Sequence, residues 1–436
     1  MDPARLVAYD VLVAVREDDA YANLVLPQLL RERDVEGRDA AFATELVGGT
    51  LRGLARYDAV VDHLAGRSPD PAIRDALRLG AHQLLGMRVP DHAAVTSTVE
   101  LVRTRVGHRA TGFVNAVLRR LSTHDLDGWM DELDAPLWVR QSHPAWVVGE
   151  LDRALDRAGE LESLLTADNE RPRVTLVARP GLSTVEELLD EPGAAAVDVS
   201  PLAVVLEGGD PGAVTAVREG RAGVQDAGSQ LVALALVRAE VSGEDRRWLD
   251  LCAGPGGKAA LLAALATERG ARLLANERQP HRARLVAQAL RATTGDVVVG
   301  DGARPPWTDG VFDRVLVDAP CSGLGALRRR PESRWRRTRA DVVGLVPLQR
   351  DLLGSALDSV RAGGVVLYAT CSPAVDETAS VVEAVLADRS DVHLEDVGAL
   401  LPEAADATSA HLAGAVQLWP HRHGTDAMFM ALLRRR

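Results

Sequence analysis

The sequence is poor in aromatic residues and cysteines, and its 50 basic residues include a single lysine, Lys258. Aromatic residues make up only 3% of the 436 residues, so the cores must be built mainly from Ala, Val and Leu within the 47% apolar content. Three cysteines in a chain of this length do not form a disulfide framework, and their spacing does not match paired metal ligands. We therefore expect a cytoplasmic protein without a bound metal, in which thiols stay free for chemistry.

Long apolar runs are also missing, so we expect no membrane span. The apolar stretch over residues 6–14 contains Asp10 and is followed by no small-residue cleavage site, which favours an ordinary helix over a signal peptide. The net charge of −12 argues against indiscriminate binding of nucleic acid, although it leaves room for a local basic face. The length predicts two or three domains.

Residues 1–123 show apolar residues at helical spacing and almost no strand-like alternation, which predicts an all-α bundle. Asp2 and Pro3 supply a helix N-cap and a proline at the first helical position. The last helical stretch, residues 103–120, is basic and contains no acidic residue. It is either a patch for RNA phosphates or a solvated helix face. Its basic residues are Arg103, Arg105, His108, Arg109, Arg119 and Arg120.

The predicted secondary structure changes twice along the rest of the chain. Residues 124–165 are expected to form a polar connector, and residues 166–238 a small α+β adaptor with strands at 173–177 and 204–206. Residues 239–436 alternate between strands and helices, which predicts a doubly wound α/β domain with a parallel sheet. Its strands are expected at residues 248–252, 272–275, 297–299, 315–317 and 365–368, and a helix over residues 345–360 is expected to end at Gly363-Gly364.

A glycine-rich loop, Asp250-Leu-Cys-Ala-Gly-Pro-Gly-Gly-Lys258, lies between the first of these strands and a helix. It lacks the residues of a phosphate-binding Walker loop, but Gly254, Gly256 and Ala259 fit a dinucleotide fingerprint. By itself the loop does not separate a nicotinamide dehydrogenase from a methyltransferase. Glu277 after the second strand could accept the ribose hydroxyls of an adenosine-containing cofactor, and Asp301 after the third could reach its adenine.

Two cysteines follow the next two strands. Cys321 lies in Asp318-Ala-Pro-Cys-Ser-Gly323 and Cys371 in Ala369-Thr-Cys-Ser-Pro373, so a parallel sheet brings them side by side, whereas Cys252 is expected to be an inert core residue. A thiolate that adds to carbon 6 of cytosine makes carbon 5 nucleophilic enough to accept a methyl group. A second thiol can help to expel the first.

Between these cysteines, residues 327–339 contain seven arginines, one tryptophan and one acidic residue. Arginine suits phosphate oxygens and tryptophan can stack on a base, so this run predicts an RNA contact. The candidate RNA-binding residues are Arg328, Arg329, Arg330, Arg334, Trp335 and Arg336.

With these motifs, the chain resembles the bacterial ribosomal RNA cytosine-C5 methyltransferases of the Fmu/Sun branch of the NOL/NOP/Sun family. Residues 1–123 resemble its NusB-type RNA-binding domain, residues 223–230 its entry into a class I, Rossmann-like methyltransferase domain, and residues 424–430 its closing strand. The chain departs from the family at Gly254, Ala259 and Glu277, where alanine, threonine and aspartate are usual. In the adaptor, Leu176-Val-Ala-Arg179 replaces an arginine-valine-asparagine pattern.

The resemblance implies an S-adenosylmethionine-dependent enzyme that acts, as a monomer, on a cytosine of small-subunit ribosomal RNA. It implies that Cys371 is the nucleophile, that Cys321 assists release and that Asp318 contacts the cytosine. Three alternatives remain open: an oxidoreductase, a non-catalytic RNA-binding factor, and an enzyme in which Cys321 is the nucleophile. The implied cofactor-binding residues are Cys252, Ala253, Gly254, Pro255, Gly256, Gly257, Lys258, Glu277, Asp301 and Asp318.

Overall fold

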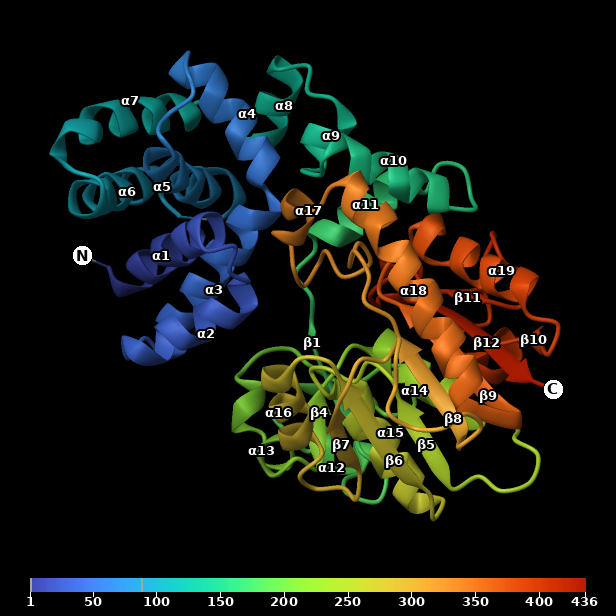
Figure 1. Ribbon diagram of the computed structural model, residues 1–436. Coiled ribbons are helices and arrows are strands. Elements are labelled where there is room, and N and C mark those ends of the chain that lie inside the picture. Colours follow the sequence, from blue (N-terminus) through green and yellow to red (C-terminus); the bar gives the residue numbers. More distant parts are fainter. Residues whose placement is uncertain (1, 88) are drawn as a thin grey trace. The chain divides into compact units, whose positions relative to one another are not determined.

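The computed structural model describes residues 2–87 and 89–436 (Figure 1). The chain divides into two compact units. The first contains the segments up to Gly149, Leu161–Arg171 and Leu327–Arg336, and the second contains Glu150–Glu160, Pro172–Ala326 and Arg337–Arg436. None of the helices in the described ranges is long and apolar enough to cross a membrane.

The first unit begins as the expected bundle of helices. Asp2 caps the first helix by accepting a hydrogen bond from the Arg5 backbone N–H (3.2 Å), and Pro3 opens the helix. Buried Val, Leu and Ala side chains from every helix form one core, which confirms the expected all-α architecture. The helices are α1 (Pro3–Glu17), α2 (Ala22–Glu32), α3 (Gly37–Arg52), α4 (Leu54–Ala65), α5 (Pro71–Ala81), α6 (Asp91–Arg105) and α7 (Thr111–Leu121).

Two expected features of this region differ in the structure. Residues 103–120 are not one helical stretch, because Gly107 takes a positive φ of 128° between α6 and α7. The segment over residues 124–165, expected to be a polar connector, is largely helical, and Pro136 and Pro144 stand directly before two of its helices, where proline is tolerated. Its helices are α8 (Leu126–Glu132), α9 (Leu137–Arg140), α10 (Ala145–Ala154) and α11 (Leu161–Asn169).

The second unit contains two sheets. The smaller is antiparallel, in the order β2-β3-β1-β4, and includes both expected strands of the adaptor. Helix α12 (Val185–Leu189) packs on it, and Leu176, Leu188 and Val204 form its small core. Its strands are β1 (Val174–Ala178), β2 (Ala194–Ala196), β3 (Ala203–Leu206) and β4 (Ala222–Val224), and α13 (Thr215–Glu219) precedes β4.

The larger sheet has the order β10-β12-β9-β8-β5-β6-β7, with β11 paired to β12. All five strands expected from the sequence are present and parallel, and the antiparallel β12 continues the sheet beyond β9. The strands are β5 (Arg247–Asp250), β6 (Arg272–Glu277), β7 (Asp296–Val299), β8 (Phe312–Asp318), β9 (Val360–Thr370), β10 (Val392–Glu395), β11 (Val416–Gln417) and β12 (Phe429–Arg435).

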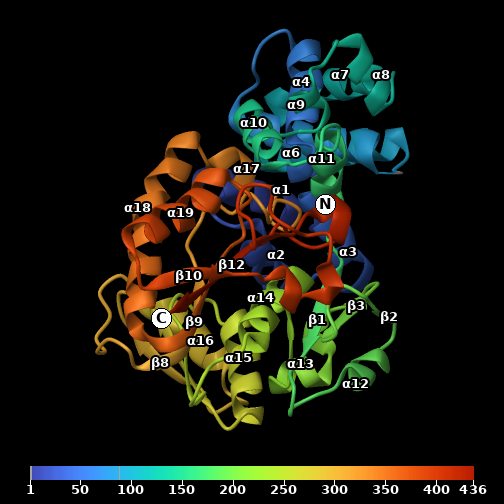
Figure 2. The ribbon, with the colours of Figure 1, turned by 90° about the vertical axis from the view of Figure 1, so that its right-hand side faces the viewer.

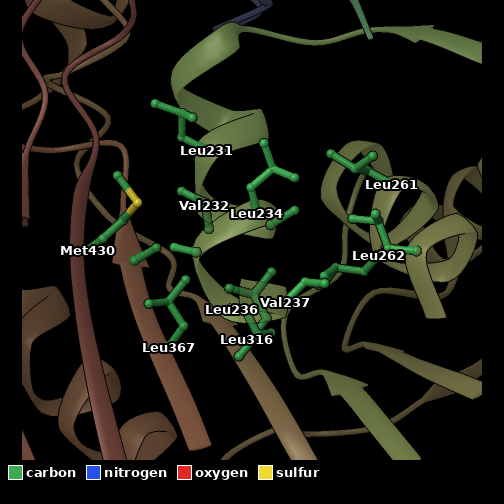
Figure 3. Packing of buried hydrophobic residues seen from close by; sticks show 14 of the residues in the cluster. Leu231, Val232, Leu234, Leu236, Val237, Leu261, Leu262, Leu316, Leu367 and Met430 are labelled. Atoms are coloured by element: carbon green, nitrogen blue, oxygen red, sulfur yellow. The ribbon is translucent and has the colours of Figure 1, made fainter. Parts of the chain in front are cut away.

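Helices cover both faces of this sheet (Figures 1 and 2). Alternate residues of β8 show the two layers, because Leu316 packs with α14 and α15 while Val315 and Val317 pack with α18 and α19. Figure 3 shows the first layer, in which Leu231, Leu261 and Met430 contribute to one apolar core. The helices are α14 (Ala227–Arg238), α15 (Gly257–Glu268), α16 (Pro280–Ala289), α18 (Arg339–Ser359), α19 (Ala379–Asp388) and α20 (Pro420–His423).

The end of α18 differs from its expected position. The helix stops at Ser359, and Gly363 and Gly364 lie inside the irregular first part of β9, where the pairing with β8 shifts register. A Cβ on Gly364 would lie 2.7 Å from the Asp313 carbonyl oxygen, so these glycines allow close approach of two strands. They do not end the helix.

Candidate active site

The carboxyl ends of four parallel strands bring most of the candidate residues to one edge of the sheet. Asp250 ends β5, Glu277 ends β6, Asp318 ends β8, and Cys371 directly follows β9. The register places Asp318 opposite Ala369, so the loops that carry the two cysteines leave neighbouring strands at the same level. Such an edge is where doubly wound sheets bind their ligands.

The glycine-rich loop closes tightly around this edge. A Cβ on Gly254 would lie 2.0 Å from Glu277 Oε2, and one on Gly256 would lie 2.7 Å from the Ala289 Cβ. Gly256 also has a positive φ of 110° and caps α15. The backbone conformation of Gly256 and its close approach to α16 therefore require glycine, whereas a Cβ on Gly254 would meet only the ends of flexible side chains such as that of Glu277.

Glu277 is held from two directions. Its Oε1 accepts a hydrogen bond from the Gln279 backbone N–H (2.8 Å), and its Oε2 lies 3.7 Å from Arg282 Nε. Arg282 also donates to the Gly254 carbonyl oxygen (2.6 Å), which ties the glycine loop to the end of β6. Asp301 is half-buried after β7, and its carboxylate accepts a hydrogen bond from the Ala303 backbone N–H (3.1 Å).

Asp250 is the first residue of the glycine-rich motif, but the sequence alone assigned it no role. Its side chain is 1% exposed, and neither carboxylate oxygen has a hydrogen-bond partner within the described structure. Burial, together with the nearby negative charge of Asp318, raises the pKa of Asp250 to about 8. Asn276 Oδ1, which is also buried, lacks a partner as well. Two buried acceptor groups without partners at the same edge of the sheet, on Asp250 and Asn276, indicate a ligand with hydrogen-bond donors.

The two thiols meet at this edge. Cys321 Sγ lies 3.5 Å from Cys371 Sγ, and both side chains are half-buried. The hydrogen bond from Cys321, with the positive charge of Lys258, lowers the pKa of Cys371 despite burial. The same hydrogen bond, burial and surrounding negative charge raise the pKa of Cys321. The pair is thus polarised, with Cys371 the better thiolate and Cys321 the better proton donor.

Lys258 connects the glycine loop to the cysteines. Its Nζ lies 2.8 Å from Asp318 Oδ2. Burial acts to lower the pKa of Lys258, but the pairing with Asp318 outweighs it, so the pKa is raised and the amine stays charged. The only lysine of the chain therefore supplies a permanent positive charge beside the cysteine pair.

Backbone contacts fix the two cysteine loops against each other. Gly325 N–H donates to the Cys371 carbonyl oxygen (2.9 Å), and Ala427 N–H donates to the Gly325 carbonyl oxygen (2.8 Å). A Cβ on Gly325 would lie 2.1 Å from the Ala427 carbonyl oxygen, so any larger residue would separate these segments.

The arginine-rich run is placed differently from this site. Leu327–Arg336 packs with the first unit, where α17 (Ser333–Arg336) lies beside α11 (Figure 1). Arg334 is fully buried and donates to the carbonyl oxygens of Ser142 (2.9 Å) and Asp168 (3.2 Å) and to Asn169 Oδ1 (2.8 Å). The expectation that Arg334 binds RNA is therefore corrected: its guanidinium group holds the interior of the first unit together.

The neighbours of Arg334 vary in exposure. Arg336 is half-buried and donates to the carbonyl oxygens of Val15 (3.3 Å) and Ala20, while Arg330 is exposed, 5.5 Å from the centre of the Tyr21 ring. Arg328 is buried, and Arg329 and Trp335 are half-buried. Only Arg330 of the six candidates therefore presents an exposed side chain. By contrast, the basic residues at 103, 105, 108, 109, 119 and 120 are all exposed.

Comparisons with known proteins agree with this geometry. Residues 238–434 match the model of the family described as 16S rRNA methyltransferase RsmB/F, and residues 2–123 match the NusB family. The chain is 52% identical to Rv1407 of Mycobacterium tuberculosis, which is named as a methyltransferase, over 100% of this chain and 97% of that one. It is 32% identical to ribosomal RNA small subunit methyltransferase B of Escherichia coli, over 90% of this chain and 92% of that one. The chain belongs to the RsmB/F family of 16S rRNA methyltransferases.

A solved structure supports the fold. The crystal structure of PH0851 superposes with a TM-score of 0.82 at 22% identity and covers 100% of this chain and 99% of that one. The RsmB/F membership confirms the NusB-type bundle and the Rossmann-like methyltransferase domain, and it sets aside the oxidoreductase alternative.

RsmB/F proteins use S-adenosylmethionine, and the residues at the sheet edge fit this cofactor. The orphaned carboxylate of Asp250 can accept a hydrogen bond from the amino group of the cofactor, and Glu277 can accept hydrogen bonds from its ribose hydroxyls. Among the described residues, no group of three or more His, Cys, Asp and Glu is arranged to hold a metal ion.

Sequence reasoning missed Asp250 and Asn276 at this site, and also Glu377, a buried residue in the turn Val375–Glu377 that follows the Cys371 loop. Asp250 opens the glycine motif, so its position was a usable signal. Asn276 and Glu377 carry no composition signal, and only their buried positions in the fold reveal them.

Proposed function

We propose that this protein methylates carbon 5 of a cytosine in small-subunit ribosomal RNA, with Cys371 as the nucleophile. The observation that carries the proposal is the 3.5 Å contact between the Cys321 and Cys371 thiols, beside the Lys258–Asp318 ion pair. Methylation of a nitrogen or a hydroxyl needs no thiol, whereas methylation at carbon 5 requires a nucleophile at carbon 6.

In the first step, the Cys371 thiolate adds to carbon 6 and forms a C–S bond, which makes carbon 5 electron-rich. The hydrogen bond from Cys321 and the charge of Lys258 favour the reactive thiolate. This polarity supports Cys371 as the nucleophile over the exchanged roles.

Asp318 is suited to orient the base. A carboxylate accepts a hydrogen bond from the exocyclic amine of cytosine, and the 2.8 Å ion pair with Lys258 holds the Asp318 side chain at the strand end. When bound, S-adenosylmethionine supplies an electrophilic methyl group to carbon 5. The residues proposed to hold it are Cys252, Ala253, Gly254, Pro255, Gly256, Gly257, Lys258, Glu277, Asp301 and Asp318.

Release requires that the proton on carbon 5 leaves to a base, such as water. The electron pair of that C–H bond restores the C5–C6 double bond and expels the Cys371 thiolate. Cys321 assists because its thiol lies within hydrogen-bond distance of the Cys371 sulfur and can donate to it as it departs. The Cys371 thiolate is then regenerated for another turnover.

The RNA substrate is supported by the family description and by the name of the Escherichia coli relative. The target cytosine must be unpaired or flipped out of its stack, because carbon 6 is inaccessible to a side chain within a duplex. The exposed basic residues between positions 103 and 120, together with Arg330, are the proposed phosphate contacts, with Arg328, Arg329, Trp335 and Arg336 as further candidates.

The test uses unmodified small-subunit RNA and methyl-labelled S-adenosylmethionine, followed by digestion and identification of the labelled nucleoside. We expect label in 5-methylcytosine, a loss of roughly 10³-fold or more for Cys371→Ser, and a stable protein–RNA adduct for Cys321→Ser.

Two results would redirect the proposal. An adduct in Cys371→Ser but not in Cys321→Ser would move the nucleophile to Cys321. Cofactor binding without label in any nucleoside of small-subunit RNA would indicate a non-catalytic RNA-binding factor or a different substrate.

A further inference from the structure

Glu377 is a fully buried carboxylate in the short turn Val375–Glu377 that follows the Cys371 loop. It accepts three hydrogen bonds, and all three donors are neutral. Oε1 accepts from the Ser322 backbone N–H (2.7 Å) and from Gln349 Nε2 (3.2 Å), and Oε2 accepts from Ser322 Oγ (2.5 Å).

These donors lead directly to both cysteine loops. Ser322 follows Cys321, and its hydroxyl lies 3.1 Å from the hydroxyl of Ser372, which follows Cys371. Gln349 also donates to the Pro320 carbonyl oxygen (2.9 Å), on the other side of Cys321. One carboxylate therefore organises the residues that flank Cys321 and, through Ser322, reaches the Cys371 loop.

The Glu377 backbone is fixed as well. Its carbonyl oxygen accepts a hydrogen bond from the Tyr368 hydroxyl (2.8 Å), and the Tyr368 ring is fully buried in the core beneath β9. The carboxylate is thus anchored to the same strand that presents Cys371, while its hydrogen bonds reach the loop that presents Cys321.

Burying a carboxylate costs more free energy than burying a neutral hydrogen-bond acceptor, unless the hydrogen bonds to the carboxylate are strong. The charge at Glu377 has an effect that a neutral group would lack. It contributes to the raised pKa of Cys321, after the larger contributions from the hydrogen bond to Cys371 and from burial. The other charged groups that act on the two thiols are Asp318, Lys258 and Asp426.

We infer that Glu377 is a positioning residue that holds Cys321 against Cys371 through Ser322 and directs the reactivity of the pair to Cys371. This inference rests on the proposed function only for what the thiols do to RNA. The contact geometry and the unequal reactivity of the two thiols are properties of the protein alone.

The test compares the wild-type protein with Glu377→Gln and Glu377→Ala. Each protein is treated with iodoacetamide at neutral pH, and alkylation of each cysteine is followed by peptide mass spectrometry. Glutamine can keep an acceptor for Ser322 N–H and Gln349, but it removes the charge. We therefore expect the Cys371:Cys321 alkylation ratio to fall severalfold in Glu377→Gln, because Cys321 loses a neighbouring negative charge that raises its pKa.

Glu377→Ala also frees Ser322, so we expect kcat to fall by about 10²-fold, as for a misplaced catalytic group, with the KM for S-adenosylmethionine unchanged. Asp376→Asn is the matched control. Asp376 precedes Glu377 in the same turn but faces Arg153 (3.2 Å) and Arg339 (2.7 Å). It should leave the alkylation ratio unchanged.

A wild-type alkylation ratio in Glu377→Gln, in protein that retains its thermal unfolding transition, would overturn the inference. A loss of activity in Glu377→Ala that matched only its loss of folded protein would also overturn it. If the alkylation ratio falls but the wild-type protein makes no 5-methylcytosine, the proposed function fails while the role of Glu377 stands.

Discussion

The cysteine loops and the arginine-rich segment between them both stand out in the sequence, but the fold places their side chains in different ways. Cys321 and Cys371 meet at 3.5 Å because two parallel strands end at the same level. Arg334, which lies between them in the chain, is buried among carbonyl oxygens of the first unit. The strand order of the sheet determines where the two thiols lie, whereas hydrogen-bond partners far away in the sequence determine where Arg334 lies.

This difference shows what local composition can and cannot reveal. A residue at a strand end inherits its neighbours from the sheet, so the pattern of strands is enough to pair Cys321 with Cys371. An arginine such as Arg334, in the short helix α17, takes whichever partners the tertiary fold offers. Ser142, Asp168 and Asn169 lie more than 150 residues from Arg334 in the sequence, and no local pattern connects them to it.

The largest effect that would test the comparison is on stability. We expect Arg334→Met to destabilise the first unit by about 3 kcal/mol, because it removes the donor to Ser142, Asp168 and Asn169 from a dry interior. Urea unfolding, with hydrogen exchange over residues 137–171, measures this change. Arg330→Met is the matched control and should change stability by less than about 0.5 kcal/mol, because Arg330 is exposed. Equal losses of stability in the two variants would contradict the structural role of the buried Arg334.

Much of the architecture was predictable from the sequence. The α bundle, the adaptor strands, the five parallel strands and the glycine loop all followed from hydrophobic periodicity and turn residues. The errors occurred where one residue type serves two purposes. Pro136 and Pro144 lie in a segment expected to be a polar connector but precede helices, and Gly363 and Gly364 were expected to end a helix but allow a close strand contact. Glu377 was missed because a single buried acid in a turn has no signature before its partners are known.

The next effect concerns the acidity of Cys371. The thiolate is the reactive form and its pKa is lowered, so alkylation of Cys371 should rise with pH and level off at a lower pH than for an ordinary thiol. Cys321→Ala removes the largest cause of this shift and Lys258→Met removes a smaller one. Both variants should therefore move the rise to higher pH, Cys321→Ala further than Lys258→Met.

For Lys258→Met we expect severalfold slower alkylation at pH 7, because Cys371 loses a positive charge that lowers its pKa. Measuring the alkylation without cofactor separates this effect from any change in S-adenosylmethionine binding. An unchanged profile in both variants would mean that the fold brings the thiols together without polarising them.

The smallest effect concerns the arginines that remain exposed. Arg330→Ala and Arg109→Ala should each weaken binding of small-subunit RNA by a few-fold, and each should reduce the slope of log affinity against log salt by about one if the side chain contacts one phosphate. Arg272→Ala is the control, because Arg272 is 71% exposed but begins β6, at the opposite end of the strand from Glu277. Filter binding over a range of salt concentrations measures these changes. If Arg272→Ala changed the slope as much as Arg330→Ala, exposed positive charge in general would account for RNA binding, and the arginine-rich segment would have no special role. The contrast between the cysteine loops and the arginine-rich segment would then depend only on the buried Arg334.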